Sequence, residues 1–349
     1  MGVYLKIGYL LNLSIDSLAN QVFCIDGHGS ANQSIYSGGR ASSPGGQTDE
    51  LQKIRFDDTA AVALNTTSLT ENRRHHTSSS DGDNLYVAQG RGSGGYRSAI
   101  EKLSFTSGAA MTITNNTLSA ARTGLAATGT ATSQVYFGGR EAGGYPFTRH
   151  DTVEYIKNDD STTATAMDSM NIPRWHHCVA GNGLDAIVCH GWDNMTDNGI
   201  DTAGAATTTY EKYRLVTYDV YELSSITVMN AIDMAPKNDV NAASGGDCVI
   251  IAGAEEPDYT VVYDTIKKIR YDDNVSTMSQ SLSVACKEVM AAGDGLQVMV
   301  AGGFPFTGSA TGNAINTIQQ IRVDDLSAIY TASNSMTTGR AEGALSSGY

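Results

Sequence analysis

A short apolar run that ends in glycine occurs six times along this chain, and this repeat constrains the fold more than any other feature of the sequence. Successive runs lie about fifty residues apart, except for one interval of about sixty, and such a period is typical of repeat architectures. The runs close on Gly39, Gly90, Gly139, Gly191, Gly253 and Gly303. We therefore expect an array of similar units.

Each unit contains four segments with the patterns of β-strands. Residues 122–129 show the first segment, which is rich in small residues, and a tight turn such as Gly293-Asp294-Gly295 follows it. The apolar run that ends in glycine comes next. After a variable loop, residues 153–160 alternate between apolar and polar side chains and close on two acids, and residues 161–167 form a Thr-rich fourth segment. The 37 glycines among 349 residues also favour short strands and turns over helices.

Four antiparallel strands in each repeat predict an all-β fold, a β-propeller of four-stranded blades. We expect one domain over residues 1–349 with six full repeats. Residues 1–20 and 339–349 are expected to close the ring as a split or abbreviated seventh blade, or to add edge strands to six blades. The repeats run over residues 21–71, 72–121, 122–173, 174–235, 236–285 and 286–338.

The unit resembles the kelch repeat. Residues 122–173 match it best, with Gly138-Gly139-Arg140 at the end of the second strand and Val153-Glu154-Tyr155-Ile156 on the third. The resemblance implies a kelch-like propeller. The Gly-Gly-Arg step and the Ser, Thr, Asn and Ala-rich composition look like those of virion structural proteins of marine and cyanobacterial phages. One departure is that kelch repeats usually carry a Trp on the fourth strand, a place that neither Trp175 nor Trp192 occupies.

Charge and cysteine usage exclude several classes of function. The formal net charge is −14, with 37 acids against 23 bases, so we expect no nucleic-acid partner. A membrane span needs about 20 apolar residues in a row, and without such a run no membrane insertion is expected. The five cysteines stand singly and without CxxC spacing, which predicts buried thiols over a disulfide framework. Cys178 and Cys189 are the pair that one hairpin could bring together.

Two basic, histidine-containing segments stand out. Arg174-Trp175-His176-His177-Cys178, with His190 one strand later, contains the residue types that bind zinc. Because neighbouring residues on a strand point to opposite faces, we expect an aromatic surface or core there and no metal. Arg73-Arg74-His75-His76 holds the equivalent place in the second repeat. We expect it in a solvated turn, or at a channel mouth where it would attract an anion or an acidic partner.

Pairs of aspartates close the third strand of several repeats. A catalytic pair occurs once in a protein, whereas a recurring pair indicates a structural turn in which Asp caps its own backbone. Calcium binding in one or more of these turns stays open. The pairs are residues 57–58, 159–160, 272–273 and 324–325.

No enzyme motif is found in the sequence. It contains no Gly-x-Ser-x-Gly elbow, no HExxH and no phosphate-binding loop. A sialidase-like propeller would need a cluster of arginines with a Tyr and an acid, whereas the arginines of this chain are scattered along the sequence. We therefore expect a non-enzymatic protein without a cofactor.

Recognition is expected in the variable loops, because propeller loops carry function at one rim. Several loops combine aromatic and polar residues, which suit stacking on sugars and contacts with proteins equally. The candidate recognition residues are Tyr96, Tyr145, Phe147, Trp192, Asp193, Tyr259, Phe304 and Phe306.

Three functional hypotheses follow from these patterns. The leading one is a structural or interaction protein of a phage virion, in the tail or as a head decoration, which binds other virion subunits within a symmetric assembly. The alternative is a receptor-binding or glycan-binding module for host attachment. The third is a glycan-active enzyme.

Overall fold

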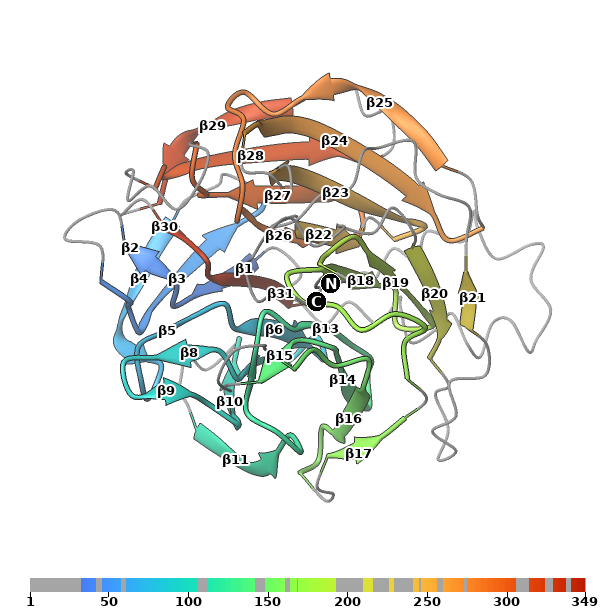
Figure 1. The fold of residues 1–349 in the computed structure, drawn as a ribbon. Coiled ribbons are helices and arrows are strands. Elements are labelled where there is room, and N and C mark those ends of the chain that lie inside the picture. Colours follow the sequence, from blue (N-terminus) through green and yellow to red (C-terminus); the bar gives the residue numbers. More distant parts are fainter. Residues whose placement is uncertain are drawn as a thin grey trace, which may run out of the picture.

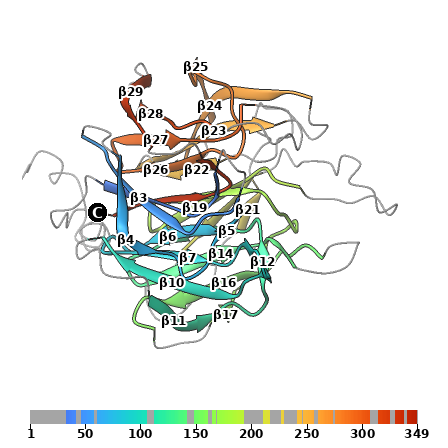
Figure 2. The ribbon, with the colours of Figure 1, turned by 90° about the vertical axis from the view of Figure 1, so that its left-hand side faces the viewer.

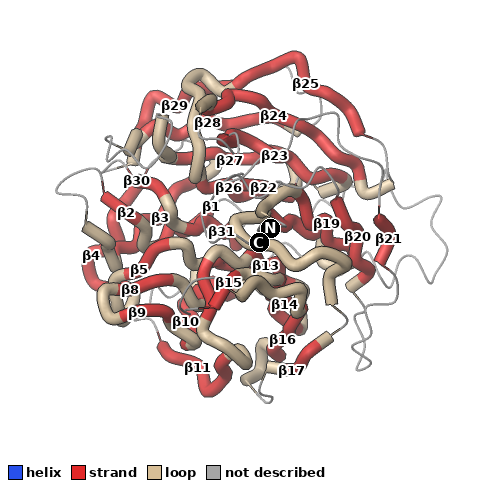
Figure 3. Tube along the Cα trace, in the orientation of Figure 1, coloured by secondary structure: helices blue, strands red, loops and turns tan. Residues whose placement is uncertain are grey.

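The structure is a computed structural model in which all regular elements are β-strands (Figure 3). It describes residues 33–41, 46–57, 61–105, 112–141, 148–160, 164–167, 169–192, 210–215, 226–228, 241–244, 246–255, 260–272, 275–305, 314–323, 329–336 and 340–348. Within these ranges no helix has the length and apolarity for a membrane span. The predicted all-β class is confirmed.

Six four-stranded antiparallel sheets contain most of the described strands, each running from the axis to the rim (Figure 1). The first three, in the order of the repeats, are β31 (Ala344–Gly348), β1 (Gln33–Ser37), β3 (Glu50–Arg55) and β4 (Ala61–Ser68); β6 (Thr77–Ser80), β7 (Asn84–Ala88), β10 (Ala99–Ser104) and β11 (Thr112–Thr117); and β13 (Ala126–Gly129), β14 (Ser133–Phe137), β16 (Val153–Lys157) and β17 (Thr165–Ala166).

The fourth to sixth sheets have the same order. They are β18 (Cys178–Gly181), β19 (Asp185–Cys189), β20 (Tyr210–Arg214) and β21 (Ile226–Val228); β22 (Asn241–Ser244), β23 (Cys248–Glu255), β24 (Val262–Arg270) and β25 (Val275–Ser281); and β26 (Met290–Gly293), β27 (Gln297–Ala301), β28 (Thr317–Arg322) and β29 (Ile329–Ser335).

Three small sheets extend this framework at the ends of the second strands. They are β2 (Arg40–Ala41) with β30 (Arg340–Ala341); β5 (Arg73–Arg74) with β8 (Arg91–Gly92) and β9 (Gly95–Tyr96); and β12 (Arg122–Thr123) with β15 (Arg140–Glu141).

The innermost strands form a closed ring. β31, β6, β13, β18, β22 and β26 each lie beside the next, and β26 lies beside β31 (Figure 1). Figure 2 shows the same sheets from the side. This is a β-propeller-like arrangement, in which four-stranded sheets surround a central axis.

Strand β31 completes the first sheet. It pairs with β1 in antiparallel register, and Leu345 lies opposite Tyr36. The C-terminal segment of the predicted seventh blade therefore lies in the sheet of the first repeat, and six four-stranded sheets are found in the described residues. The other segment of that blade, residues 1–20, lies outside the described residues.

The hydrophobic core is divided into clusters between neighbouring sheets. Ile35 and Leu51 of the first sheet pack with Leu85 and Val87 of the second, and a comparable cluster fills each of the other five interfaces. The alternation along each strand explains this arrangement, because side chains on its two faces are buried against two different neighbours. Each repeat thus depends on the next for half of its core.

The glycine step at the end of each second strand links one repeat to the next. Gly138 and Gly139 both have positive φ, 54° and 91°, which favours glycine. The Gly139 N–H donates to the Arg174 carbonyl of the following repeat at 2.9 Å. A Cβ at Gly138 would lie 2.7 Å from the same oxygen. The glycine step thus makes a sharp turn and brings the backbone close to the neighbouring sheet.

Candidate functional site: the loop-bearing face

The small sheets lie at the end of the ring where second strands end and inner strands begin. We call this end the loop-bearing face, and it consists of the strands β2, β5, β8, β9, β12, β15 and β30 together with the segments that precede the inner strands. Loops between second and third strands emerge at the same end. The face therefore combines a fixed backbone frame with the most variable parts of the sequence.

A belt of three backbone hydrogen bonds joins the segments before four neighbouring inner strands, β31, β6, β13 and β18, on this face. The residue two positions before an inner strand is left-handed wherever the structure describes it, as in His75, Gly124, His176 and Glu342, with φ values of 50°, 62°, 52° and 58°. The His75 N–H donates to the Glu342 carbonyl at 2.8 Å, Gly124 to His75 at 3.0 Å, and His176 to Gly124 at 2.8 Å. These bonds hold the side chains on the belt in a fixed order around the axis.

A continuous row of side chains crosses the belt. The buried Glu342 carboxylate accepts hydrogen bonds from Arg74 Nη1 at 2.8 and 3.1 Å and lies 3.4 Å from His75 Nε2. The His75 ring stacks on His176 with 4.7 Å between centroids, and the Trp175 ring lies 4.0 Å from that of His176. The Arg140 guanidinium lies 3.7 Å from the centre of the Trp175 ring, within the range of a cation–π contact. We call these six residues the axial row.

Arginines face one another at two places beside the axial row. Arg74 is directly opposite Arg91 across β5 and β8, and Arg140 forms a β-bridge with Arg149. Like charges directly opposite each other on paired strands repel, so each place favours an anion nearby. Arg40 adds a further guanidinium 3.8 Å from Glu342. Arginines that are scattered along the sequence thus gather on one face of the structure.

At the opposite end of the ring, arginines form ion pairs with aspartates. There three arginines that end a third strand lie beside an aspartate, with Arg55 3.5 Å from Asp57, Arg214 3.3 Å from Asp185 and Arg270 3.3 Å from Asp272. These pairs neutralise the charge locally. Among the described residues, the two places where arginines face one another lie on the loop-bearing face.

A second group of arginines is structural. Arg73, Arg122 and Arg174, each four residues before an inner strand, are fully buried and pair with Glu101, Glu154 and Glu211 on the third strands of their own sheets. Arg122 also donates to the Gly138 carbonyl at 2.8 Å, at the glycine step. Burial lowers the pKa of Arg122 to about 10. These pairs hold the belt to the sheets and present no charge to solvent.

Two histidines beneath the belt are neutral at physiological pH. His76 and His177 each precede an inner strand, and burial lowers the pKa of each to about 3, with Arg73 and Arg174 lowering it further. His76 Nε2 lies 3.0 Å from Ser37 Oγ. The two imidazoles therefore pack as polar core groups and add no charge to the face.

The metal-site candidate is not assembled. The expected strand does not reach His176, because that residue is left-handed and β18 begins at Cys178. The expected alternation of His176 and His177 along a strand is therefore wrong. In the part of the chain that the structure describes, no three His, Cys, Asp or Glu side chains come together as metal ligands.

The cysteines behave as buried thiols. Cys178 and Cys189 lie opposite each other across the hairpin, as the sequence suggested, and both are free and buried. Burial raises the pKa of the Cys189 thiol, and it raises the pKa of Cys248 and Cys286 to about 12. A raised pKa keeps a thiol protonated and unreactive. Cys24 lies outside the described residues.

The described members of the aspartate pairs lie in turns, and aspartates cap the backbone in another set of turns. Asp57, Asp159 and Asp272 lie in the turns after third strands. The backbone caps belong to the turns between first and second strands, where Asp81 Oδ1 accepts from the Asn84 N–H at 2.7 Å and Asp294 Oδ1 from the Gln297 N–H at 2.7 Å. Asp58, Asp273, Asp324 and Asp325 lie outside the described residues.

The described recognition candidates differ in accessibility. Tyr96 is half-buried in β9, whereas Trp192 and Phe304 are only 4% and 5% exposed. Both buried rings belong to β-bridges with the segment that precedes an inner strand, opposite Trp175 and Lys287. Little of either ring is left for a ligand. The remaining candidates, Tyr145, Phe147, Asp193, Tyr259 and Phe306, lie outside the described residues.

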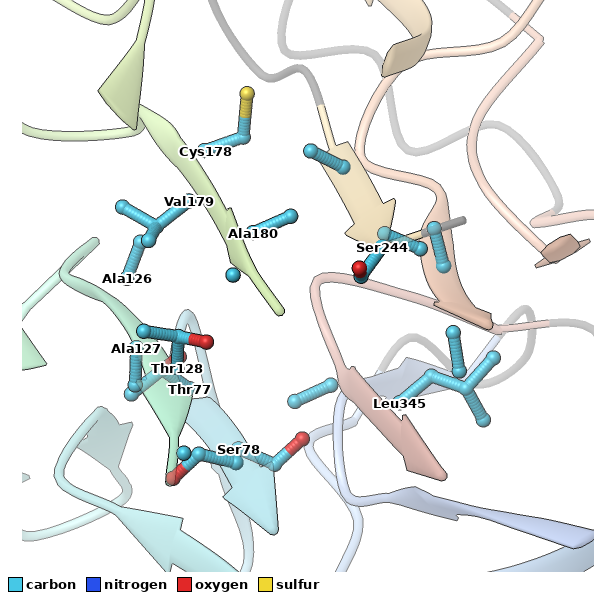
Figure 4. Close-up of a pocket in the computed structure, with 18 of the residues that line it drawn as sticks. Thr77, Ser78, Ala126, Ala127, Thr128, Cys178, Val179, Ala180, Ser244 and Leu345 are labelled. Atoms are coloured by element: carbon cyan, nitrogen blue, oxygen red, sulfur yellow. The ribbon is translucent and has the colours of Figure 1, made fainter. Parts of the chain in front are cut away.

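The axis itself holds a narrow channel lined by the inner strands. Its volume is about 160 Å³, and Figure 4 shows small side chains such as Ser78, Ala127 and Ala180 around it. The first segment of the repeat is rich in small residues, and such residues fit the limited room at the axis. Among the lining residues that the structure describes there is no Asp, Glu, Lys or Arg.

Comparison with known proteins shows the fold. No protein-family model and no curated protein matches the chain. A solved structure with a similar fold is that of YjhT, with a TM-score of 0.62 and 13% identical residues, over 81% of this chain and 90% of YjhT. At this identity the likeness concerns the arrangement of strands alone, and on that arrangement the chain is a β-propeller-like protein.

Proposed function

We propose that this chain is a non-enzymatic binding protein whose loop-bearing face holds an anionic partner. The observation that carries the proposal is the placement of Arg74 opposite Arg91 and of Arg140 beside Arg149, next to the mouth of the channel. Arginine forms strong, charge-assisted hydrogen bonds with carboxylates and phosphates. A face that juxtaposes arginines in a protein of net charge −14 is suited to an acidic surface of another molecule.

The proposed architecture is a kelch-like propeller of six blades. Six four-stranded sheets, a closed ring of inner strands and a glycine step in each repeat support it. The first blade takes its inner strand, β31, from the C-terminal segment. Such a ring presents one broad face to a partner and keeps few open sheet edges.

The proposed setting is a phage virion, where the chain would be a tail or head-decoration protein within a symmetric assembly. The support is the kelch-like pattern of the sequence and the absence of any enzyme motif in it. Virion subunits meet through repeated, complementary surfaces, and a propeller face supplies one such surface per copy.

The test is to count the chain in purified particles from the source culture by quantitative mass spectrometry, together with face variants. Arg140→Glu should reduce incorporation about tenfold, which corresponds to about 1.4 kcal/mol of binding free energy. The matched control is Arg270→Glu, at the opposite end of the ring. Absence of the wild-type chain from particles would overturn the virion setting. Equal incorporation of all three proteins would overturn the role of the face.

Host attachment is the second candidate function. The half-buried Tyr96, at the edge of the same face, supports it, because an aromatic ring beside arginines suits a glycan that carries acidic groups. In that case the purified protein should bind host cells saturably, and Tyr96→Ala should weaken the binding.

A further inference from the structure

The small sheet of the second repeat carries three side chains in a line on its outer face. β5, β8 and β9 lie side by side in this sheet (Figure 1), with Arg74 opposite Arg91 and Arg91 opposite Tyr96. Residues that lie directly opposite each other on antiparallel strands point to the same face of a sheet. Arg74, Arg91 and Tyr96 therefore form one line across the sheet, which we call the outer row.

The other face of this sheet is covered beside β5 and β8. Arg73 is fully buried there in its pair with Glu101. A Cβ at Gly92 would lie 3.2 Å from Nε of Arg97, whose guanidinium pairs with Glu71. The two arginines on the covered face are thus neutralised within the protein, whereas the outer row is turned away from them.

Arg91 and Tyr96 form a closely spaced pair within the outer row. The Arg97 N–H donates to the Gly90 carbonyl at 3.0 Å. Because hydrogen-bonded and non-hydrogen-bonded pairs alternate along antiparallel strands, Arg91 and Tyr96 are a non-hydrogen-bonded pair. In such pairs the Cα atoms are about 4.5 Å apart and the side chains lie close together. The backbone therefore holds a guanidinium next to an aromatic ring.

The Arg91 guanidinium is accessible and has no partner among the residues that the structure describes. The residue is exposed, and its side chain forms no hydrogen bond, ion pair or ring contact with them. Tyr96 is half-buried, and its side chain also forms none with them. By contrast, Arg74 and Arg97 on the neighbouring strands each pair with a glutamate. Arg91 can therefore bind a ligand without giving up an internal contact.

We infer that the outer row binds a polysaccharide through one sugar ring and the acidic group that this ring carries. The apolar face of the ring packs on Tyr96, and the acidic group accepts charge-assisted hydrogen bonds from Arg91. Arg74, which Glu342 already contacts, contributes less to the binding. The inference rests on host attachment, the second candidate function, and specifies the contact by which it occurs. Carboxylated and sulfated sugars both present this chemistry.

The surroundings of the outer row favour a polysaccharide over a protein surface. In a protein interface, Tyr and Arg anchors are surrounded by further contacts that exclude water. The turn next to the outer row, residues 93–95, contains only serine and glycine. The exposed large hydrophobic residues of the described chain, Val261 and Leu296, belong to other repeats. One aromatic ring beside a charged donor is enough for a sugar, and the sheet provides both.

The test measures binding of polymers to the purified protein by calorimetry. Polygalacturonate carries carboxylates on its sugars, dextran sulfate carries sulfates, dextran is neutral, and poly-L-glutamate carries carboxylates without sugar rings. We expect at least one acidic polysaccharide to bind, and dextran and polyglutamate to bind at least about tenfold more weakly. The net charge of −14 opposes unspecific binding of polyanions, which sharpens the contrast. Binding of neither acidic polysaccharide would overturn the inference. Equal binding of polyglutamate would also overturn it and would indicate an acidic protein partner.

Variants locate the binding on the outer row. Arg91→Gln and Tyr96→Ala should each weaken binding of the acidic polysaccharide about tenfold, whereas Tyr96→Phe keeps the ring and should retain the binding. Because the Arg91 side chain has no partner among the described residues, Arg91→Gln should leave the melting temperature unchanged. The matched control is Arg97→Gln, which removes the same charge from the covered face of the same sheet.

The outcomes separate the outer row from host attachment. Unchanged affinity in both Arg91→Gln and Tyr96→Ala would refute the outer row, and so would an equal loss in Arg97→Gln. If the protein binds neither acidic polysaccharide but still binds host cells saturably, the inference fails while host attachment stands.

Discussion

The third and sixth repeats fill the same buried position with different chemistry. In the third repeat, Arg122 lies four residues before the inner strand β13 and pairs with Glu154. Glu154 is on the third strand, opposite Tyr136 of the second strand. In the sixth, Cys286 holds the place of the arginine and Gln319 that of the glutamate. A buried ion pair has been replaced by a neutral pair.

The hydrogen bond that both repeats keep shows what the position requires. Glu154 Oε1 accepts from the Ser119 N–H at 2.9 Å, and Gln319 Oε1 accepts from the Ser283 N–H at 2.6 Å. Each donor lies three residues before the arginine or cysteine. In these two repeats the third strand keeps an oxygen acceptor, and the charge is present or absent on both partners together. This agrees with the high cost of a single unpaired buried charge.

The largest predicted effect comes from breaking the pair in the third repeat. Arg122→Cys leaves the Glu154 carboxylate buried without its cation and should lower the free energy of unfolding by about 3–5 kcal/mol. The double variant Arg122→Cys/Glu154→Gln reproduces the sixth repeat and should recover most of that loss. Urea denaturation of both measures the difference. A double variant no more stable than the single one would show that the two repeats are not interchangeable.

The glycine steps offer a smaller and more local test. Gly138→Ala places a Cβ 2.7 Å from the Arg174 carbonyl at a φ of 54°, and should cost about 2–3 kcal/mol through crowding and backbone strain. Gly183→Ala adds the strain alone, because its φ is 84° but no atom lies within 4 Å. Gly46→Ala adds neither. Equal melting temperatures of the three variants would contradict the importance of the close approach.

Replacing His177 should change the stability least at neutral pH and more in acid. Its folded pKa of about 3 lies below the ordinary value of 6.5, so the unfolded chain takes up a proton first. The contribution of the neutral His177 ring to the free energy of unfolding is fully present above pH 6.5 and is lost as the pH falls towards about 3. The third and sixth repeats have Leu125 and Val289 at this place. His177→Leu should therefore flatten the acid side of the stability–pH curve, measured by chemical denaturation. An unchanged slope would exclude His177 as a source of acid sensitivity.

The architecture could be predicted from the sequence because it depends on local, repeated patterns. The glycine steps, the alternating third strands and the small residues of the first strands each follow from the geometry of one strand or turn. The position of residues 339–349 was harder to predict. Their pattern shows an inner strand, but only the pairing of Leu345 with Tyr36 decides which sheet receives it.

The candidate site could be predicted only in part. The basic segment that contains Arg74 and His75 was singled out, and a channel mouth was one of its expected places. The axial row was not foreseen, since it joins residues as distant as Arg74 and Glu342, which are 268 positions apart. The residue types also do not reveal that Trp192 is buried. Trp192 forms a β-bridge with Trp175, and each tryptophan lies next to or near a left-handed residue, His176 or His190. The sequence does not mark either histidine as a turn residue.

The pairing of β31 with β1 has a consequence for synthesis. Ser37 and Ala344, which face each other in the first sheet, are separated by 307 positions. At about 5–20 residues per second, β1 leaves the ribosome tens of seconds before its partner exists. During that time its inner edge is open to pairing with other nascent chains. Ring closure therefore has to wait for the synthesis of β31, and the time between the two strands sets the period in which β1 lacks its partner.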